Sequence, residues 1–194
     1  HSLRGFERLK RDDNRRWECS LAEVVYDKDG RTADLLARIV HVPDTFWTDR
    51  IVGDWAYFQW QVANPDAPKS VAEICMERGD RAGAHYSVNY GVDILVELLY
   101  ALNREFLPPP KWRMTRLKGL EWRPRRLESI LNEAMVVRDT GPEDLERRLR
   151  AMRRAAARCR CAPRCSAAAD VARGIRSCRA SGCCRTPNTR LKGC

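Results

Sequence analysis

Residues 83–106 constrain the fold of this chain more than any other segment, because their apolar side chains recur every three or four positions. The recurring apolar residues are Val88, Val92, Leu95, Val96, Leu99, Leu102 and Phe106. This spacing predicts an amphipathic helix, and we expect it to be the longest and most apolar helix of the protein. An apolar side of this length needs other helices to cover it.

Several shorter segments show the same spacing of apolar residues, and together they predict a helical bundle with short loops. These segments are residues 31–42, 44–63, 71–78, 125–137 and 142–157. The second carries Trp47, Trp55 and Phe58, whose helical spacing indicates packing in the core rather than a platform for stacking bases. The expected fold class is therefore mainly α.

Residues 19–30, CSLAEVVYDKDG, break the helical pattern and predict at most a short N-terminal strand or hairpin. The residues that favour β structure are Val24, Val25 and Tyr26. Asp27 and Asp29 follow with the spacing of a carboxylate pair that can hold a divalent metal at the end of a strand. The alternative is that both aspartates belong to a turn and bind no metal.

The string LNREFLPPPKW places three prolines directly after the end of the long helix. Prolines cannot continue a helix, so we expect a stiff extended segment that holds Lys111 and Trp112 at a set distance from the last helical turn. One interpretation is a rigid connector whose tryptophan seals the end of the bundle. The other is a corner that faces a bound nucleotide or acceptor, with a cation meeting phosphate. The residues of this candidate binding corner are Asn103, Arg104, Glu105, Lys111 and Trp112.

Arg78 and His85 form the candidate catalytic pair of the sequence. Their spacing resembles the ribonuclease motif of the HEPN superfamily, a group of small helical nucleotide-binding domains. In that motif the histidine acts in acid–base cleavage and the arginine steadies the phosphate. The alternative is a surface histidine near the start of a helix.

Positive charge and cysteine are concentrated in residues 158–194. This stretch holds nine of the 36 Lys and Arg, one of the 26 acidic residues and seven of the nine cysteines. Its apolar content is too low to offset the entropy of ordering a chain, so we expect a disordered tail rich in Arg, Ala and Cys. The cysteines lack the paired C-x2-C spacing of structural zinc sites. Because GC-rich coding DNA yields this composition when read out of frame, a frameshifted end is our hypothesis.

Residues 1–157 are nearly neutral, so the body of the chain does not support nucleic-acid binding through general phosphate attraction. With Cys19 and Cys75 as its cysteines, this body is expected to be a reduced, cytoplasmic domain rather than a disulfide scaffold. No apolar run approaches the roughly 20 residues that a membrane span needs, so we expect no membrane partner.

Three strings in this order, AEVVYDKDGRTADLL, YALNREFLPPPKW and RRLESILNEAM, resemble the helical C-terminal region of an uncharacterised family linked to nucleotidyltransferases. The resemblance covers residues 17–140. In that family a nucleotidyltransferase core precedes the helical bundle. The implied organisation is the end of a truncated nucleotidyltransferase-like core or an entry segment at 1–30, a helical bundle domain at 31–157, and the tail at 158–194.

The resemblance implies a helical accessory domain that binds substrate for a magnesium-dependent enzyme, which transfers a nucleotidyl group from a nucleoside triphosphate. The positions carried over from the family are Asn103, Glu105, Pro108, Lys111 and Trp112. The Gly-Ser turn that cradles phosphates in such enzymes does not occur in this sequence. We therefore expect no cofactor in this chain and no activity from it alone. Magnesium and a nucleoside triphosphate would accompany a core supplied in cis or in trans.

Two other functions stay open at this point. The chain is alternatively a non-catalytic helical interaction module that pairs with a separate nucleotidyltransferase, or a ribonuclease of the HEPN type. For the accessory domain, the expected ligand is a nucleotide or a small-molecule acceptor.

Overall fold

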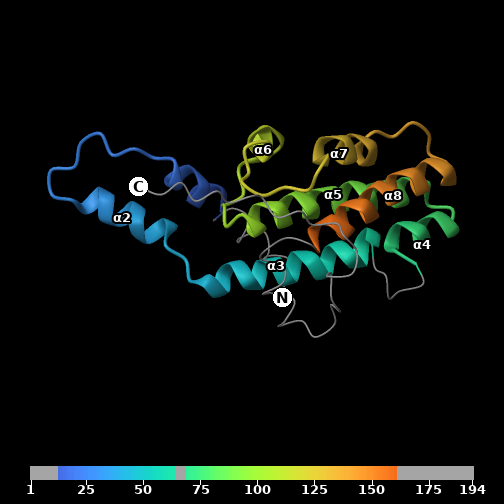
Figure 1. Ribbon diagram of the computed structural model, residues 1–194, viewed down its shortest axis with the longest axis horizontal. Coiled ribbons are helices and arrows are strands. Elements are labelled where there is room, and N and C mark those ends of the chain that lie inside the picture. Colours follow the sequence, from blue (N-terminus) through green and yellow to red (C-terminus); the bar gives the residue numbers. More distant parts are fainter. Residues whose placement is uncertain (1–12, 64–68, 161–194) are drawn as a thin grey trace, which may run out of the picture.

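The computed structural model describes residues 13–63 and 69–160, and every regular element in these ranges is helical (Figure 1). The elements are α2 (Arg31–Val40), α3 (Asp44–Phe58), the π-helical turn η1 (Gln59–Ala63), α4 (Val71–Glu77), α5 (Arg81–Leu102), α6 (Pro110–Leu117), α7 (Leu127–Met135) and α8 (Pro142–Cys159). Residues 13–20 are helical as well. The prediction of a mainly α fold is confirmed.

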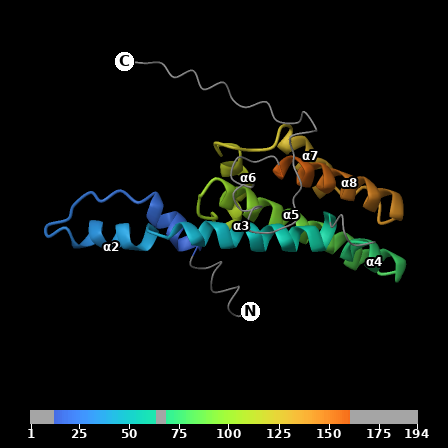
Figure 2. The same cartoon turned by 60° about the horizontal axis from the view of Figure 1, so that its bottom comes forward.

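Helix α5 is the centre of the bundle, with α3 and α4 along one side and α7 and α8 along another (Figures 1 and 2). It is the longest described helix, as its apolar spacing predicts, although it ends at Leu102 instead of residue 106. The backbone N–H of Gly83 donates a 2.7 Å hydrogen bond to the side chain of Asp80, which caps the first turn. The fully buried core side chains include Phe58, Val62, Leu95, Leu98, Leu99, Leu149 and Met152.

The aromatic stripe of α3 packs in the core, which confirms its interpretation from helical spacing. Trp47 and Phe58 are buried, and Trp55 packs partly buried against the same cluster. Beyond it, η1 brings Val62 against α5 at Gly91, where a Cβ atom would lie 2.8 Å from Cγ1 of Val62. Glycine is therefore required at this crossing, because any larger residue would push the two elements apart.

The extended segment predicted after the three prolines is shorter than expected. The chain reverses direction after α5 through Arg104, whose φ of 57° lies in the left-handed region. Pro110 is already the first residue of α6, a position where the missing N–H of proline costs no helical hydrogen bond. Lys111 and Trp112 therefore lie on the first turn of a helix, and the prediction that an extended segment carries them is wrong.

The sequence allows at most a short strand or hairpin at residues 19–30, and none forms there. The chain is helical up to Ser20 and irregular from residue 21 to 30. Val25 and Tyr26 are 94% and 80% exposed, and no strand of the described ranges lies beside them. Residues that favour β structure form a stable strand only where another strand supplies partners for their backbone groups.

Residues 21–40, which we call the arm, project from one end of the bundle (Figures 1 and 2). The helical residues 13–20 anchor the base of the arm, where Asp13 forms an ion pair with Arg50 of α3. Helix α2, which forms the second half of the arm, contains no buried residue, and Leu35 is 50% exposed. The arm therefore contributes little to the core.

Helix α8 ends at Cys159, so the first residues of the predicted tail at 158–194 belong to a helix. Residues 161–194 lie outside the described ranges. The predicted disorder, the frameshift hypothesis and the tail cysteines other than Cys159 all concern these residues. The three-part organisation stays a prediction. Over the described ranges, none of the helices has both the length and the apolar character that crossing a membrane requires.

Candidate functional site

Two residues of the predicted binding corner are engaged in contacts within the bundle. The Asn103 side-chain amide donates to the carbonyls of Leu99 and Trp122 at 2.7 and 2.8 Å and accepts from the Trp122 N–H at 2.7 Å. Both amide hydrogens are therefore used, and Asn103 ties the loop after α6 to the end of α5. Arg104 donates to Asp44 at 2.9 Å, in an exposed ion pair between the turn after α5 and the start of α3.

The other three residues of the predicted corner lie around the start of α6. Partial burial raises the pKa of Glu105, and the nearby positive charge of Arg116 opposes this rise. The Nζ atom of Lys111 lies 5.9 Å from the centre of the Trp112 ring, and Trp112 is 44% exposed. Lys111 and Trp112 are thus accessible neighbours, and ligand binding by the corner stays a prediction.

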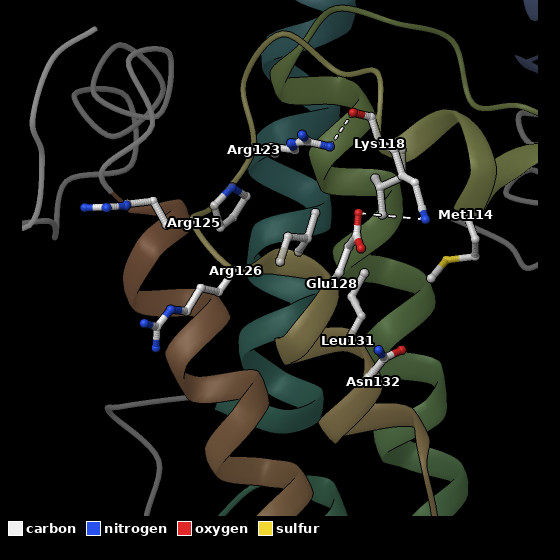
Figure 3. A pocket seen from close by; sticks show the side chains of 11 residues that line it. Met114, Lys118, Arg123, Arg125, Arg126, Glu128, Leu131 and Asn132 are labelled. Atoms are coloured by element: carbon white, nitrogen blue, oxygen red, sulfur yellow. Dashed lines mark hydrogen bonds and ion pairs between the residues drawn. The ribbon is translucent and has the colours of Figure 1, made fainter.

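A groove of about 670 Å³ opens between α6, α7 and the loop that joins them (Figure 3). Its lining combines positively charged side chains with apolar ones. The cationic residues are Lys118, Arg123, Arg125 and Arg126, and the apolar residues include Leu117, Leu127 and Leu131. This volume falls in the range of small-molecule sites, which typically pair an apolar lining with a few polar groups.

The charged side chains at the mouth of the groove make one hydrogen bond to the backbone and one long ion pair. Arg123 donates to the backbone carbonyl of Lys118, and Nζ of Lys118 lies 3.9 Å from a carboxylate oxygen of Glu128 (Figure 3). An exposed ion pair at that distance adds little stability, so Lys118 can turn toward an anionic ligand at small cost. The backbone carbonyl of Arg125 accepts a hydrogen bond from Arg158, which fastens the loop to α8.

His85 lies beside Arg148 instead of Arg78, in a buried polar cluster where α5, α7 and α8 meet. Arg148 is fully buried, and it donates to the carbonyl of Ala134 at 2.6 Å and to Nδ1 of His85 at 2.6 Å. Burial, and then the charge of Arg148, lower the pKa of His85. Arg78 is exposed at the end of α4. The geometry gives His85 a structural partner, and ribonuclease activity stays a prediction.

Asp27 and Asp29 lie in the turn that begins α2. A carboxylate oxygen of Asp27 accepts a 2.8 Å hydrogen bond from the N–H of Ala33, and Asp29 accepts one of 3.4 Å from Arg31. The bond from Ala33 lowers the pKa of Asp27. Across the described ranges, no group of three or more His, Cys, Asp or Glu side chains is arranged to hold a metal. The turn is thus the role that the contacts support, and metal binding by this pair stays a prediction.

The sequence interpretation missed the groove entirely, although a signal for it was present. Residues 118–126, KGLEWRPRR, concentrate positive charge in a short segment of an otherwise nearly neutral body. A basic loop that precedes an apolar helix is a pattern expected for an anion-binding surface. Averaging the charge over residues 1–157 concealed it.

The described residues form a helical domain with a groove lined by cationic and apolar side chains. A comparison with known families adds the family to which the chain belongs. The family described as "Domain of unknown function (DUF4037)" matches residues 12–113, slightly more than half of the chain. The chain therefore belongs to this family. No curated protein and no solved structure matches the chain. The matched segment ends before the groove, whose lining starts at Met114.

Proposed function

We propose that this chain is a helical accessory domain that binds a nucleotide substrate for a nucleotidyltransferase-like core supplied in cis or in trans. The observation that carries the proposal is the groove between α6 and α7, with its cationic mouth. The link to nucleotidyltransferases rests on the resemblance of the three sequence strings. In this proposal the chain supplies binding and positioning, and the core supplies magnesium and the transfer chemistry.

The composition of the groove fits a ligand with a charged part and a flat apolar part. Lysine and arginine bind phosphate oxygens through charge-assisted hydrogen bonds, and Lys118 and Arg123 present such donors at the mouth. Met114, which is 39% exposed, supplies an apolar surface against which a base can pack. Because these cations are exposed to solvent, binding should weaken as the salt concentration rises.

Calorimetric titration of the full chain with ATP tests this proposal. We expect the double variant Lys118→Gln, Arg123→Gln to bind ATP about tenfold more weakly, because two charge-assisted contacts with phosphate are lost. Lys111→Gln is the control, since Lys111 lies in the first turn of α6, near the ring of Trp112, and does not line the groove. It should change the affinity less than about twofold.

Two results would contradict the proposal. If ATP does not bind the wild-type chain at all, the chain is not a nucleotide-binding accessory domain. If Lys111→Gln weakens binding while the double variant does not, the ligand occupies the predicted corner at the start of α6, and the groove is the wrong site.

The arm favours a second function, that of a non-catalytic interaction module that pairs with a separate nucleotidyltransferase. Helix α2 has apolar residues at helical spacing but buries none of them within the described ranges. An amphipathic helix in this position is expected to dock its apolar side on another surface. This function predicts that the arm can be changed without loss of bundle stability.

A further inference from the structure

Positive charge is concentrated on α6 and on the segments that flank it. Residues 104–128 hold eight Lys and Arg and three Glu, a net charge of +5. Residues 1–103 hold 13 Lys and Arg and 17 Asp and Glu, a net charge of −4. An uneven distribution of this kind creates a positive potential over one surface. This surface attracts a polyanion even though residues 1–157 as a whole are nearly neutral.

The solvent side of α6 carries cations, and the helix contains no acid. Lys111, Arg116 and Lys118 are exposed, and helical spacing places all three within one half of the circumference. Lys118 lies 3.9 Å from Glu128, and the guanidinium of Arg116 lies 5.9 Å from the centre of the Trp17 ring. Contacts of both kinds are weak at exposed sites, so these cations are available to phosphate.

Trp112 lies on the same side of α6, between Lys111 and Arg116 around the helix, and is 44% exposed. Proteins that bind single-stranded nucleic acids combine these two elements: bases stack on aromatic rings, and cations meet the phosphates of the backbone. The paired and stacked bases of a duplex do not offer a free face to such a ring. The arrangement therefore favours an unpaired strand.

We propose that Lys111, Trp112, Arg116 and Lys118, which we call the basic face, bind a single-stranded nucleic acid. The cations meet phosphates of the strand, and one base stacks on Trp112. This binding goes beyond the proposed function and does not depend on it. Only the role of the strand rests on the proposed function. Because Lys118 also lines the groove, a strand on the basic face would pass beside the bound nucleotide, as the acceptor of a nucleotidyl group must.

Fluorescence anisotropy of the full chain with labelled oligouridylate and oligothymidylate tests the inference, with strands of about 12 nucleotides. Both strands should bind. The logarithm of the association constant should fall with the logarithm of the salt concentration with a slope of about −2, because about three phosphates are neutralised. The strand that binds more tightly identifies RNA or DNA as the preferred ligand.

The double variant Lys111→Gln, Arg116→Gln should bind both strands about tenfold more weakly, and the slope should fall to about −0.7, because two of three phosphate contacts are lost. Arg38→Gln, Arg81→Gln is the matched control. It removes the same charge from exposed positions of α2 and α5, and the affinity should change less than about twofold. Neither Lys111 nor Arg116 lines the groove, so the first variant should keep the wild-type affinity for ATP.

Trp112→Ala should bind the strands at least about fivefold more weakly with an unchanged salt slope, because stacking is lost and the charge is kept. Trp112→Phe retains a ring and should retain most of the affinity. Trp60→Ala removes a tryptophan of η1 that is 53% exposed, and it should have no effect. A duplex of the same length and polyglutamate present negative charge without accessible bases. Their binding should be the same in wild type and Trp112→Ala.

Three results overturn the inference. Equal losses in the two double variants would assign the binding to net charge instead of the basic face. An affinity for single strands that survives Trp112→Ala would show that no base stacks on this ring. Tighter binding of polyglutamate than of either strand would identify an acidic protein as the partner. If the strands bind as expected and ATP does not bind, the proposed function is overturned and this inference stands.

Discussion

At the scale of single residues, Arg148 organises the end of the bundle where α5, α7 and α8 meet. Its fully buried guanidinium donates to the carbonyl of Ala134, to Nδ1 of His85 and to the side chain of Asn89, with the negative charge of Asp144 nearby. A buried guanidinium is tolerated where its donors are satisfied in this way. The bond to Nδ1 requires a neutral imidazole, which links the packing of this region to pH.

The free energy of unfolding should fall as the pH drops below about 6.5. The pKa of His85 is lowered below its ordinary value of 6.5 in the folded protein, so the unfolded chain binds the proton first. The stabilisation is therefore complete above pH 6.5 and is lost as the pH falls toward the folded pKa. Urea unfolding at pH 7.5 and pH 5.5 measures this loss. His85→Gln keeps an acceptor for Arg148 but does not titrate, and it should show a smaller loss. Equal losses in both proteins would contradict the prediction.

At the scale of elements, Asn103 holds the loop after α6 in place and thereby shapes the wall of the groove. Asn103→Ala removes three hydrogen bonds, and we expect a free energy of unfolding lower by about 2 kcal/mol. The ATP affinity should fall as well, because the loop that carries Arg123 is no longer fixed. Arg104→Gln is the neighbouring control. It loses one exposed ion pair, and the change should be less than about 1 kcal/mol. Lost affinity with unchanged stability in Asn103→Ala would instead indicate direct contact between Asn103 and the ligand.

Helices were predictable from sequence where a local pattern decides the structure, and not where a distant partner decides it. The apolar spacing of α5 and the proline at the start of α8 are local signals, and both gave correct elements. The run around Val25 is also local, but a strand depends on a neighbouring strand that this fold does not supply in its described ranges. The pairing of His85 with Arg148 joins residues far apart in sequence, so the spacing to Arg78 could not reveal it. The groove likewise forms only when α6 and α7 come together.

At the scale of the whole molecule, the bundle contains the buried core and the arm is an appendage that buries little. Leu95 of α5 is fully buried, whereas Leu35 of α2 is 50% exposed. We therefore expect Leu95→Ala to lower the free energy of unfolding by about 2–5 kcal/mol. Leu35→Ala, a matched change in the arm, should lower it by less than about 0.5 kcal/mol. Urea unfolding of both variants at two protein concentrations provides the measurement.

The outcome for Leu35→Ala shows whether the apolar side of α2 is exposed in the isolated chain or already buried. A small loss that does not depend on protein concentration is expected if the apolar side of α2 is exposed in the isolated chain. A loss close to that of Leu95→Ala would contradict this, because it requires the side chain to be buried. If that loss grew with protein concentration, a second copy of the chain would be the cover, since association stabilises the folded state by mass action. The arm would then mediate self-association of the chain instead of binding to a separate nucleotidyltransferase.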